Sequence, residues 1–314
     1  MALKVAVTTT SQDEFNKEAR ELLKREGLEV LFYSQAKILI QKEFFKMMDG
    51  CVGVIAGTET YDRNTLSHLP NLKVISRIGV GLDTIDLRAC EELGIKVYIT
   101  PDGPTKAVAE LVIGFILILL RHIPVMDKNL HAGRWEKRLG RLFSEKRIGI
   151  IGLGRIGQEV ARLSQSLGAQ AYYYDPYVKE SRVKNIKKIN LDKLLEICDI
   201  ITLHLPLTQE NRHLIDKREL NRMKESAILI NCSRGGIVNE KALYKALKEQ
   251  RIAGAACDVF QEEPYRGPLQ ELDNIILTPH MGSYTAEAKA KMELCAVQNL
   301  ITGLREKQFL GGKA

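Results

Sequence analysis

The sequence has no pair of cysteines at the spacing of metal ligands, and most of its six cysteines lie inside apolar segments. This pattern is typical of buried free thiols in a reducing compartment, and it argues against a disulfide-stapled protein or a metal site. The six are Cys51, Cys90, Cys198, Cys232, Cys257 and Cys295.

Long apolar runs are also missing. The strongest, residues 111–120, is ten residues long, whereas a helix that crosses a bilayer needs about 20. The chain begins MALKVAVTTT and passes straight into charged sequence, without an apolar leader. We therefore expect a cytoplasmic protein with no membrane partner, in which residues 111–120 belong to a buried core helix.

No low-complexity tract and no aromatic-basic motif interrupts the chain. Its 314 residues, 45% of them hydrophobic and 27% charged, predict two soluble domains, each with its own core. The 46 Lys and Arg residues exceed the 39 Asp and Glu residues by seven, but acids are interleaved with them. We expect a solvated cationic surface that attracts small anionic substrates, and no nucleic-acid partner.

Short apolar segments alternate with amphipathic ones along two stretches, from KVAVTT to IKVYIT and from RIGIIGLGRIG to NIILT. This alternation predicts an α/β protein with two doubly wound parallel-sheet lobes. Residues 106–122 predict an apolar helix buried between layers or lobes. The last amphipathic helix has no strand partner, so we assign it to the first lobe. The predicted domains are 1–100 with 286–314, and 101–285, and ligands are expected to meet in the cleft between them.

A GxGxxG motif stands at the start of the second lobe, after the apolar strand 148–151. Gly152 suits the tight turn, Gly154 the approach of a pyrophosphate, and Gly157 the packing of helix on strand. The backbone N–H groups of Arg155 and Ile156 would lie at the positive end of that helix. Because strand, glycines and helix occur in this order, we predict a dinucleotide site.

Asp175 ends the next strand, 21 residues after Gly154, where a carboxylate can accept both ribose hydroxyls of an adenosine. The structural alternative is a turn aspartate before Pro176. A carboxylate there repels a 2′-phosphate, which favours NAD over NADP. Lys179 and Arg182 lie close enough in sequence to oppose that preference.

Three charged or titratable residues follow later strands of this lobe, namely Arg234 in NCSRGGIV, Glu263 in DVFQEEP and His280 in TPHMGSYT. Each alone has an ordinary structural explanation: a surface cation, a solvated turn acid and a helix-capping histidine. Together, a guanidinium, a carboxylate and an imidazole at the carboxyl ends of parallel strands suit hydride transfer to a carbonyl acid.

With these motifs in order, from SRIGVGLDTIDL through GLGRIG, INCSRGGIV and DVFQEEP to LTPHMGS, the chain resembles the D-2-hydroxyacid dehydrogenase family, particularly its phosphoglycerate dehydrogenase-like members. The resemblance implies a Rossmann cofactor domain and a flavodoxin-like substrate domain. It implies that Arg234 binds the substrate carboxylate and carbonyl, that His280 is the acid-base, and that Glu263 is its partner. The implied cofactor contacts are Val80, Arg155, Ile156, Asp175, Leu205, Cys232 and Asp258.

The resemblance also assigns a substrate loop to the first lobe, formed by Arg77, Gly79, Val80 and Gly81, whose backbone N–H groups take the carboxylate. Independently of the resemblance, Gly-Val-Gly after the strand LKVIS can form a small anion nest.

Two features depart from phosphoglycerate dehydrogenases. Those that bind a 3-phosphate usually carry an arginine after the third strand, where this chain has Ala56-Gly57-Thr58-Glu59. Arg77, Arg134 and Lys137 leave a phosphorylated substrate open. The chain also ends at Ala314, so we expect no C-terminal regulatory domain.

The sequence thus predicts an NAD-dependent oxidoreductase that interconverts a D-2-hydroxy acid and its 2-oxo acid, in a homodimer that forms through the cofactor lobe. Its expected contact is the apolar helix 106–122 with the segment that follows. One alternative is an NAD(H)-sensing binding protein similar to the corepressors of the family. Another is an enzyme that oxidises a different small anion, such as phosphite.

Overall fold

The computed structural model describes residues 2–9, 12–33 and 41–311. The chain divides into two compact units, unit 1 comprising Met1–Pro104 with Tyr284–Ala314, and unit 2 comprising Thr105–Ser283. The boundaries expected from the sequence, 100/101 and 285/286, lie a few residues from these.

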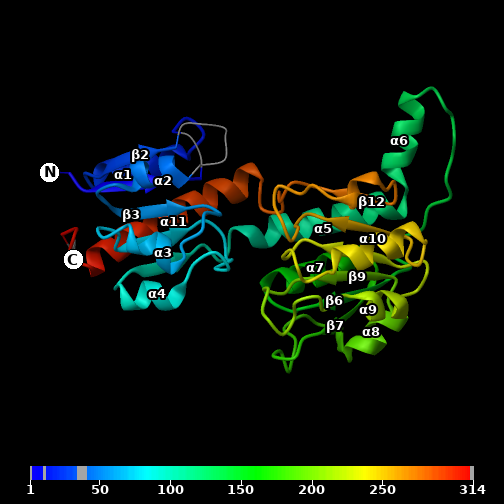
Figure 1. Ribbon diagram of the computed structural model, residues 1–314. Coiled ribbons are helices and arrows are strands. Elements are labelled where there is room, and N and C mark those ends of the chain that lie inside the picture. Colours follow the sequence, from blue (N-terminus) through cyan, green and yellow to red (C-terminus); the bar gives the residue numbers. More distant parts are fainter. Residues whose placement is uncertain (1, 10–11, 34–40, 312–314) are drawn as a thin grey trace. The chain divides into compact units, whose positions relative to one another are not determined.

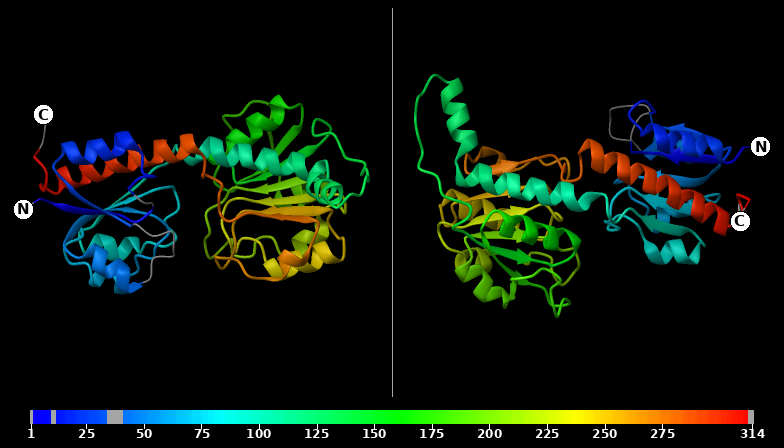
Figure 2. Two further views of the ribbon diagram at one scale, coloured as in Figure 1. Left: turned by 90° about the horizontal axis from the view of Figure 1, so that it is seen from above. Right: turned by 180° about the vertical axis from the view of Figure 1, so that it is seen from behind.

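Unit 1 is built on a parallel five-stranded sheet of order β2-β1-β3-β4-β5 (Figure 1). The strands are β1 Lys4–Val7, β2 Glu29–Phe32, β3 Cys51–Ala56, β4 Val74–Arg77 and β5 Lys96–Ile99. The helices are α1 Lys17–Arg25, α2 Gln41–Met48, α3 Arg63–Ser67, α4 Leu87–Glu92 and α11 Ala286–Glu306. Helices α1 and α11 cover one face of the sheet, and α2, α3 and α4 cover the other (Figure 2).

Helix α11 belongs to this unit although it comes last in the chain. Ala296, Val297, Leu300 and Leu304 are buried in the same core as the strand residues Val5 and Val74. The hydroxyl of Ser76 in β4 donates a hydrogen bond to the carbonyl oxygen of Ala296 at 2.8 Å. The apolar face that the sequence shows for this last helix is therefore buried against the sheet of unit 1.

Unit 2 is built on a parallel seven-stranded sheet of order β12-β11-β10-β9-β6-β7-β8. The strands are β6 Arg147–Ile151, β7 Gln170–Tyr174, β8 Lys187–Lys188, β9 Ile200–Leu203, β10 Ile228–Asn231, β11 Gly254–Cys257 and β12 Ile275–Leu277. The helices are α5 Pro104–Leu120, α6 Ile123–His131, α7 Arg155–Ser166, α8 Leu191–Ile197, α9 Lys217–Arg222 and α10 Glu240–Lys248, with a 3-10 turn at Pro268–Glu271. Helices α5 and α7 pack on one face, and α8, α9 and α10 pack on the other.

Helix α5 is less enclosed within unit 2 than its composition suggests. Val112 and Ile116 are fully buried, but Leu117 is 39% exposed and Glu110 is also exposed.

Within the described residues no single helix is long and apolar enough to cross a membrane, and only α5 and α6 taken together, with a bend of 62° between them, match such a span in length and composition. The six cysteines are free, and all but Cys295 are buried.

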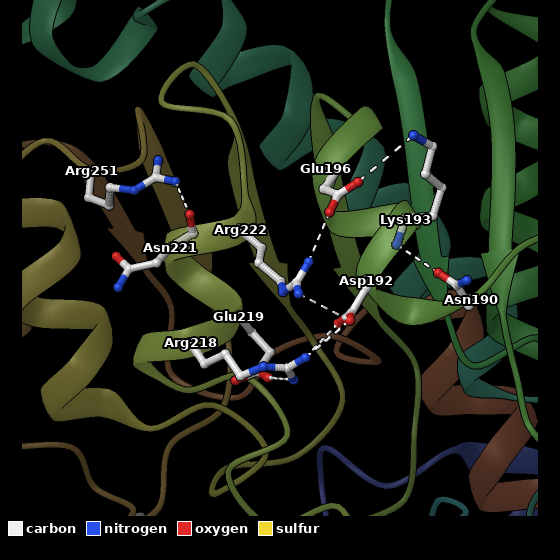
Figure 3. Close-up of polar contacts among 9 residues, drawn as sticks. All are labelled: Asn190, Asp192, Lys193, Glu196, Arg218, Glu219, Asn221, Arg222 and Arg251. Atoms are coloured by element: carbon white, nitrogen blue, oxygen red, sulfur yellow. Dashed lines mark hydrogen bonds and ion pairs between the residues drawn. The ribbon is translucent and has the colours of Figure 1, made fainter.

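Ion pairs join α8 to α9 on the surface of unit 2 (Figure 3). Arg218 contacts Asp192 at 3.0 Å, and Arg222 contacts Asp192 at 3.4 Å and Glu196 at 2.8 Å. Arg251 donates to the carbonyl oxygen of Met223, just beyond α9, at 2.7 Å. These exposed pairs each contribute little stability, but as a network they fix the helices that lead into β9 and β10.

Candidate active site

The carboxyl ends of the strands of unit 2 lie at one edge of its sheet, because all its paired strands run parallel. Doubly wound sheets bind ligands at this edge. The loops that leave β6, β9, β10, β11 and β12 carry most of the residues of this unit that the sequence predicts for the site, while Arg155, Ile156 and Gly157 form the first turn of α7 and Asp175 follows β7.

The glycine loop after β6 has the shape that a pyrophosphate requires. Gly152 has a φ of +94°, and a Cβ there would lie 2.5 Å from the carbonyl oxygen of His204. A Cβ on Gly157 would collide with the carbonyl oxygen of Gly152. A Cβ on Gly154, by contrast, would meet nothing within 4 Å, and this glycine caps α7 without any side chain. The loop thus combines tight packing with an open approach to the N-terminus of α7, which fits a dinucleotide phosphate.

Asp175 is only 7% exposed and accepts three backbone hydrogen bonds. Its Oδ2 accepts from Leu153 N–H in the glycine loop at 2.8 Å, and its Oδ1 accepts from Tyr177 at 2.8 Å and Val178 at 3.0 Å. The turn interpretation is therefore confirmed, and the same carboxylate also holds the glycine loop. A carboxylate offers about four acceptor positions, so one position remains at Oδ2, and the expected contact with the ribose hydroxyls stays a prediction.

His280 and Glu263 are in contact. The His280 Nδ1 and the Glu263 Oε2 lie 2.7 Å apart, and the Glu263 Oε1 accepts a hydrogen bond from Phe260 N–H at 3.0 Å. Burial by itself would raise the pKa of Glu263, but the hydrogen bonds from His280 and Phe260, with the charges of His280 and Arg234, lower it below its ordinary value. Glu263 is therefore an ionised partner that holds the Nδ1 side of the imidazole and leaves Nε2 for a substrate.

Asp258 fixes the loop that carries His280. Its Oδ1 accepts from the Thr278 hydroxyl at 2.5 Å and from Met281 N–H at 2.8 Å, while its Oδ2 accepts from Gly282 N–H at 2.8 Å. The Asp258 carbonyl oxygen accepts from His280 N–H at 2.8 Å. These contacts hold His280 at a φ of +51°, a conformation that residues other than glycine rarely adopt. Asp258, which the sequence suggested as a cofactor contact, acts in this unit as the support of the histidine loop.

Arg234 lies in the loop after β10, where Asn231 shapes the backbone. The Asn231 side chain donates to the Arg234 carbonyl oxygen at 3.0 Å and accepts from Ser233 N–H at 3.1 Å. A side chain at Gly235 would collide with the Phe260 backbone, so this loop packs directly on the one that leads to Glu263. Arg234 also contributes to lowering the pKa of Glu263, which places the guanidinium in the same electrostatic cluster.

The other predicted cofactor contacts of unit 2 differ in how far they are exposed to solvent. Arg155 is exposed at the first position of α7, whereas Ile156 packs partly on the core. The Leu205 side chain lies beside Gly152, and Cys232 is buried, which raises the pKa of its thiol well above the ordinary value. The sequence missed Thr278 and Asn231, although Asn231 was visible as a polar residue closing the apolar strand ILIN.

The predicted substrate loop of unit 1 follows β4. Gly79 has a φ of +112°, and its N–H donates to the Thr100 hydroxyl at 2.7 Å. Because the Gly79 N–H already donates to Thr100, the prediction that this loop binds an anion rests on the N–H groups of Val80 and Gly81. The Val80 side chain is 40% exposed.

Comparisons with known proteins agree with this geometry. Residues 113–282 match the family model described as D-isomer specific 2-hydroxyacid dehydrogenase, NAD binding domain. The chain belongs to this family. The match confirms the predicted family and the NAD cofactor, and the two parallel sheets confirm the predicted two-lobed α/β fold.

The chain is similar to several proteins of this family. It is 42% identical to D-3-phosphoglycerate dehydrogenase of Methanocaldococcus jannaschii over 78% of this chain, but spans only 48% of that protein. It is also 42% identical to glyoxylate reductase of Thermofilum pendens, over 79% of this chain and 76% of the relative. Its structure resembles D-lactate dehydrogenase of Aquifex aeolicus complexed with NAD and lactic acid, with a TM-score of 0.84, 27% identity, and coverage of 97% and 96% of the two chains.

Proposed function

We propose that this chain is an NAD-dependent dehydrogenase that interconverts a small D-2-hydroxy acid and its 2-oxo acid. The observation that carries the proposal is the 2.7 Å contact between His280 and Glu263. It lies at the sheet edge that also carries the glycine loop, with Arg234 close enough to lower the pKa of Glu263.

The proposed mechanism assigns one task to each residue. NAD, when bound, accepts or supplies the hydride at its nicotinamide ring. In the oxidative direction, His280 Nε2 takes the hydroxyl proton as the hydride leaves C2, and Glu263 stabilises the imidazolium that results. Arg234 binds the substrate carboxylate and stabilises the charge that develops on the C2 oxygen. In the reductive direction, the protonated His280 returns the proton to that oxygen.

We assign the two units different roles in this reaction. Unit 2 binds NAD, and unit 1 contributes the N–H groups of Val80 and Gly81 to the substrate carboxylate. The first assignment is supported by the glycine loop and by the family match within residues 113–282. The second is supported by the loop geometry at Gly79 alone.

We also propose a homodimer in a reducing cytoplasm, with neither nucleic acid nor membrane as a partner. Figure 1 shows α6 standing away from the sheet of unit 2. Leu130 on α6 is 56% exposed, and Trp135 and Leu139 in the following segment are 80% and 96% exposed. So much exposed apolar surface on one projecting segment favours a contact with a second copy. Free cysteines favour the reducing compartment.

The function is tested by assaying a panel of 2-oxo acids with NADH and following NADH oxidation. We expect turnover with at least one small 2-oxo acid such as glyoxylate or hydroxypyruvate. NADH binding without turnover of any acid would contradict the enzyme and favour an NAD(H)-sensing protein. Turnover of phosphite alone would contradict the substrate class.

Asp175 predicts the choice of cofactor. With the same 2-oxo acid, kcat/KM with NADH should exceed that with NADPH about tenfold or more, because the buried carboxylate repels a 2′-phosphate. Equal values, or a preference for NADPH, would show that the exposed Lys179 or Arg182 overrides the acid.

Glu263 predicts a shift in the pH profile. The pKa of Glu263 lies below its ordinary value, so the carboxylate should become protonated, and kcat/KM should fall, only at a pH below the ordinary range of a glutamate. Glu263→Gln removes the titrating charge but keeps the shape, so this acidic limb should be absent and kcat/KM should be lower at every pH above it. A Glu263→Gln enzyme with the parental pH profile would show that Glu263 is not coupled to His280.

A further inference from the structure

One carboxylate holds both ends of the short segment whose middle residue is His280. At the near end, Asp258 Oδ1 accepts a hydrogen bond from the Thr278 hydroxyl at 2.5 Å. At the far end, Oδ1 accepts from Met281 N–H and Oδ2 accepts from Gly282 N–H, both at 2.8 Å. Because Asp258 is only 1% exposed, its carboxylate is shielded from water, which makes these bonds strong and their loss costly. The segment is therefore a loop that Asp258 closes.

The sheet fixes the backbone of both partners in the hydroxyl bond. Thr278 N–H donates to the Cys257 carbonyl oxygen at 3.1 Å, which extends the pairing of β12 with β11. Asp258 N–H donates to the Asn231 carbonyl oxygen at 2.9 Å. Because both backbones are held, the hydroxyl of Thr278 acts on the side chain of Asp258 and sets the orientation of its carboxylate.

That orientation determines the course of the backbone around His280. A Cβ on Gly282 would lie 3.0 Å from the Asp258 Oδ2, so the loop approaches the carboxylate closely. His280 has a φ of +51°, a conformation that persists in a residue other than glycine only when the surroundings hold it. The ring of Pro279 restricts φ at the preceding position, which leaves the loop little freedom to relax. A carboxylate turned away would release this backbone and move the imidazole.

We propose that Thr278 is a positioning residue: through Asp258, its hydroxyl keeps the His280 imidazole where it meets Glu263. The inference rests on the proposed function and adds to it a residue that acts on the reaction only through another side chain. The contact between His280 and Glu263 is 2.7 Å long, so a small displacement of the loop would break it. A misplacement of about 1 Å can cost about a hundredfold in rate, and we expect a partial displacement to cost about tenfold.

Two substitutions separate the hydroxyl from the shape of the side chain. Thr278→Val removes the hydroxyl and keeps the branched shape, whereas Thr278→Ser keeps the hydroxyl. With NADH and the 2-oxo acid that the parent reduces best, Thr278→Val should lower kcat about tenfold, and Thr278→Ser should stay within about threefold of the parent. NADH affinity, measured by fluorescence titration, should change less than about twofold in both, because the glycine loop is untouched.

Thr65→Val is the matched control. Thr65 is buried in unit 1, and its hydroxyl also bonds to an aspartate, the Asp62 that caps α3. The variant removes the same kind of hydrogen bond from the other unit, so it should retain the parental kcat.

Amide hydrogen exchange tests the positioning without any turnover. In the parent, the N–H groups of Met281 and Gly282 should be protected, because they donate to Asp258. In Thr278→Val both should exchange about tenfold faster or more. Fast exchange at both amides in the parent would overturn the inference without any variant.

The kinetic outcomes are equally decisive. Parental kcat in Thr278→Val would overturn the inference, and so would a loss in Thr278→Ser as large as that in Thr278→Val. A fall in NADH affinity with kcat unchanged would also overturn it, because Thr278 would then act on the cofactor. If the parent reduces none of the acids, the proposed function is overturned, and the exchange rates alone then decide whether Thr278 holds the loop.

Discussion

Replacing His280 by alanine should lower kcat for reduction of a 2-oxo acid about a thousandfold, at every pH. The loss follows from the removal of the group that exchanges a proton with the substrate oxygen, and general acid-base catalysis of this kind contributes about 10² to 10⁴ in rate. The effect should exceed that of Glu263→Gln throughout, because the latter changes only the tuning of the proton donor. Single-turnover and steady-state NADH oxidation measure both.

The controls separate chemistry from folding. NADH binding to His280→Ala, followed by fluorescence titration, should remain close to that of the parent, since the glycine loop and Asp175 are untouched. His68→Ala removes an exposed histidine at the end of α3 and should retain parental kinetics. Parental turnover in His280→Ala would show that His280 is not the acid-base of the reaction.

Arg234→Ala should raise KM for the 2-oxo acid and lower kcat, so that kcat/KM falls about a hundredfold. A guanidinium can bind a carboxylate through two parallel charge-assisted hydrogen bonds, and alanine loses both together with the charge near the C2 oxygen. Arg234→Lys should recover only part of the activity, because an ammonium lacks the planar fork. NADH affinity should be nearly unchanged in both variants.

Arg266→Ala is the matched control for this series, since Arg266 is an exposed arginine of the same unit. It should have parental kinetic constants. If Arg234→Ala behaved in the same way as Arg266→Ala, Arg234 would be a surface cation and the substrate anchor would have to be sought elsewhere.

The parts of this molecule that could be predicted from sequence depend on local patterns. The glycine loop is defined by residues within six positions of each other, and its backbone requirements at Gly152 and Gly157 follow from the turn and the packing of α7 on β6. Apolar runs with intervening amphipathic segments likewise indicate parallel strands and crossover helices, because burial on both faces of the sheet is a property of each segment.

Contacts between loops could not be predicted in this way. Thr278 reaches Asp258, and Thr100 takes the N–H of Gly79, only because the sheets bring neighbouring strand ends together. Neither contact leaves a periodic signal in the sequence. Glu59 shows the same limit, because the missing arginine at Gly57 was visible whereas the bond from Gly57 N–H to the acid was not.

The central claim is that the chain transfers hydride between NAD and C2 of a 2-oxo acid to give the D product. Its most direct test is to reduce hydroxypyruvate with NADH deuterated on the transferring face and to analyse the glycerate by chiral chromatography and mass spectrometry. We expect D-glycerate with one deuterium at C2, formed in step with NADH oxidation. L-glycerate, or product without deuterium at C2, would contradict it.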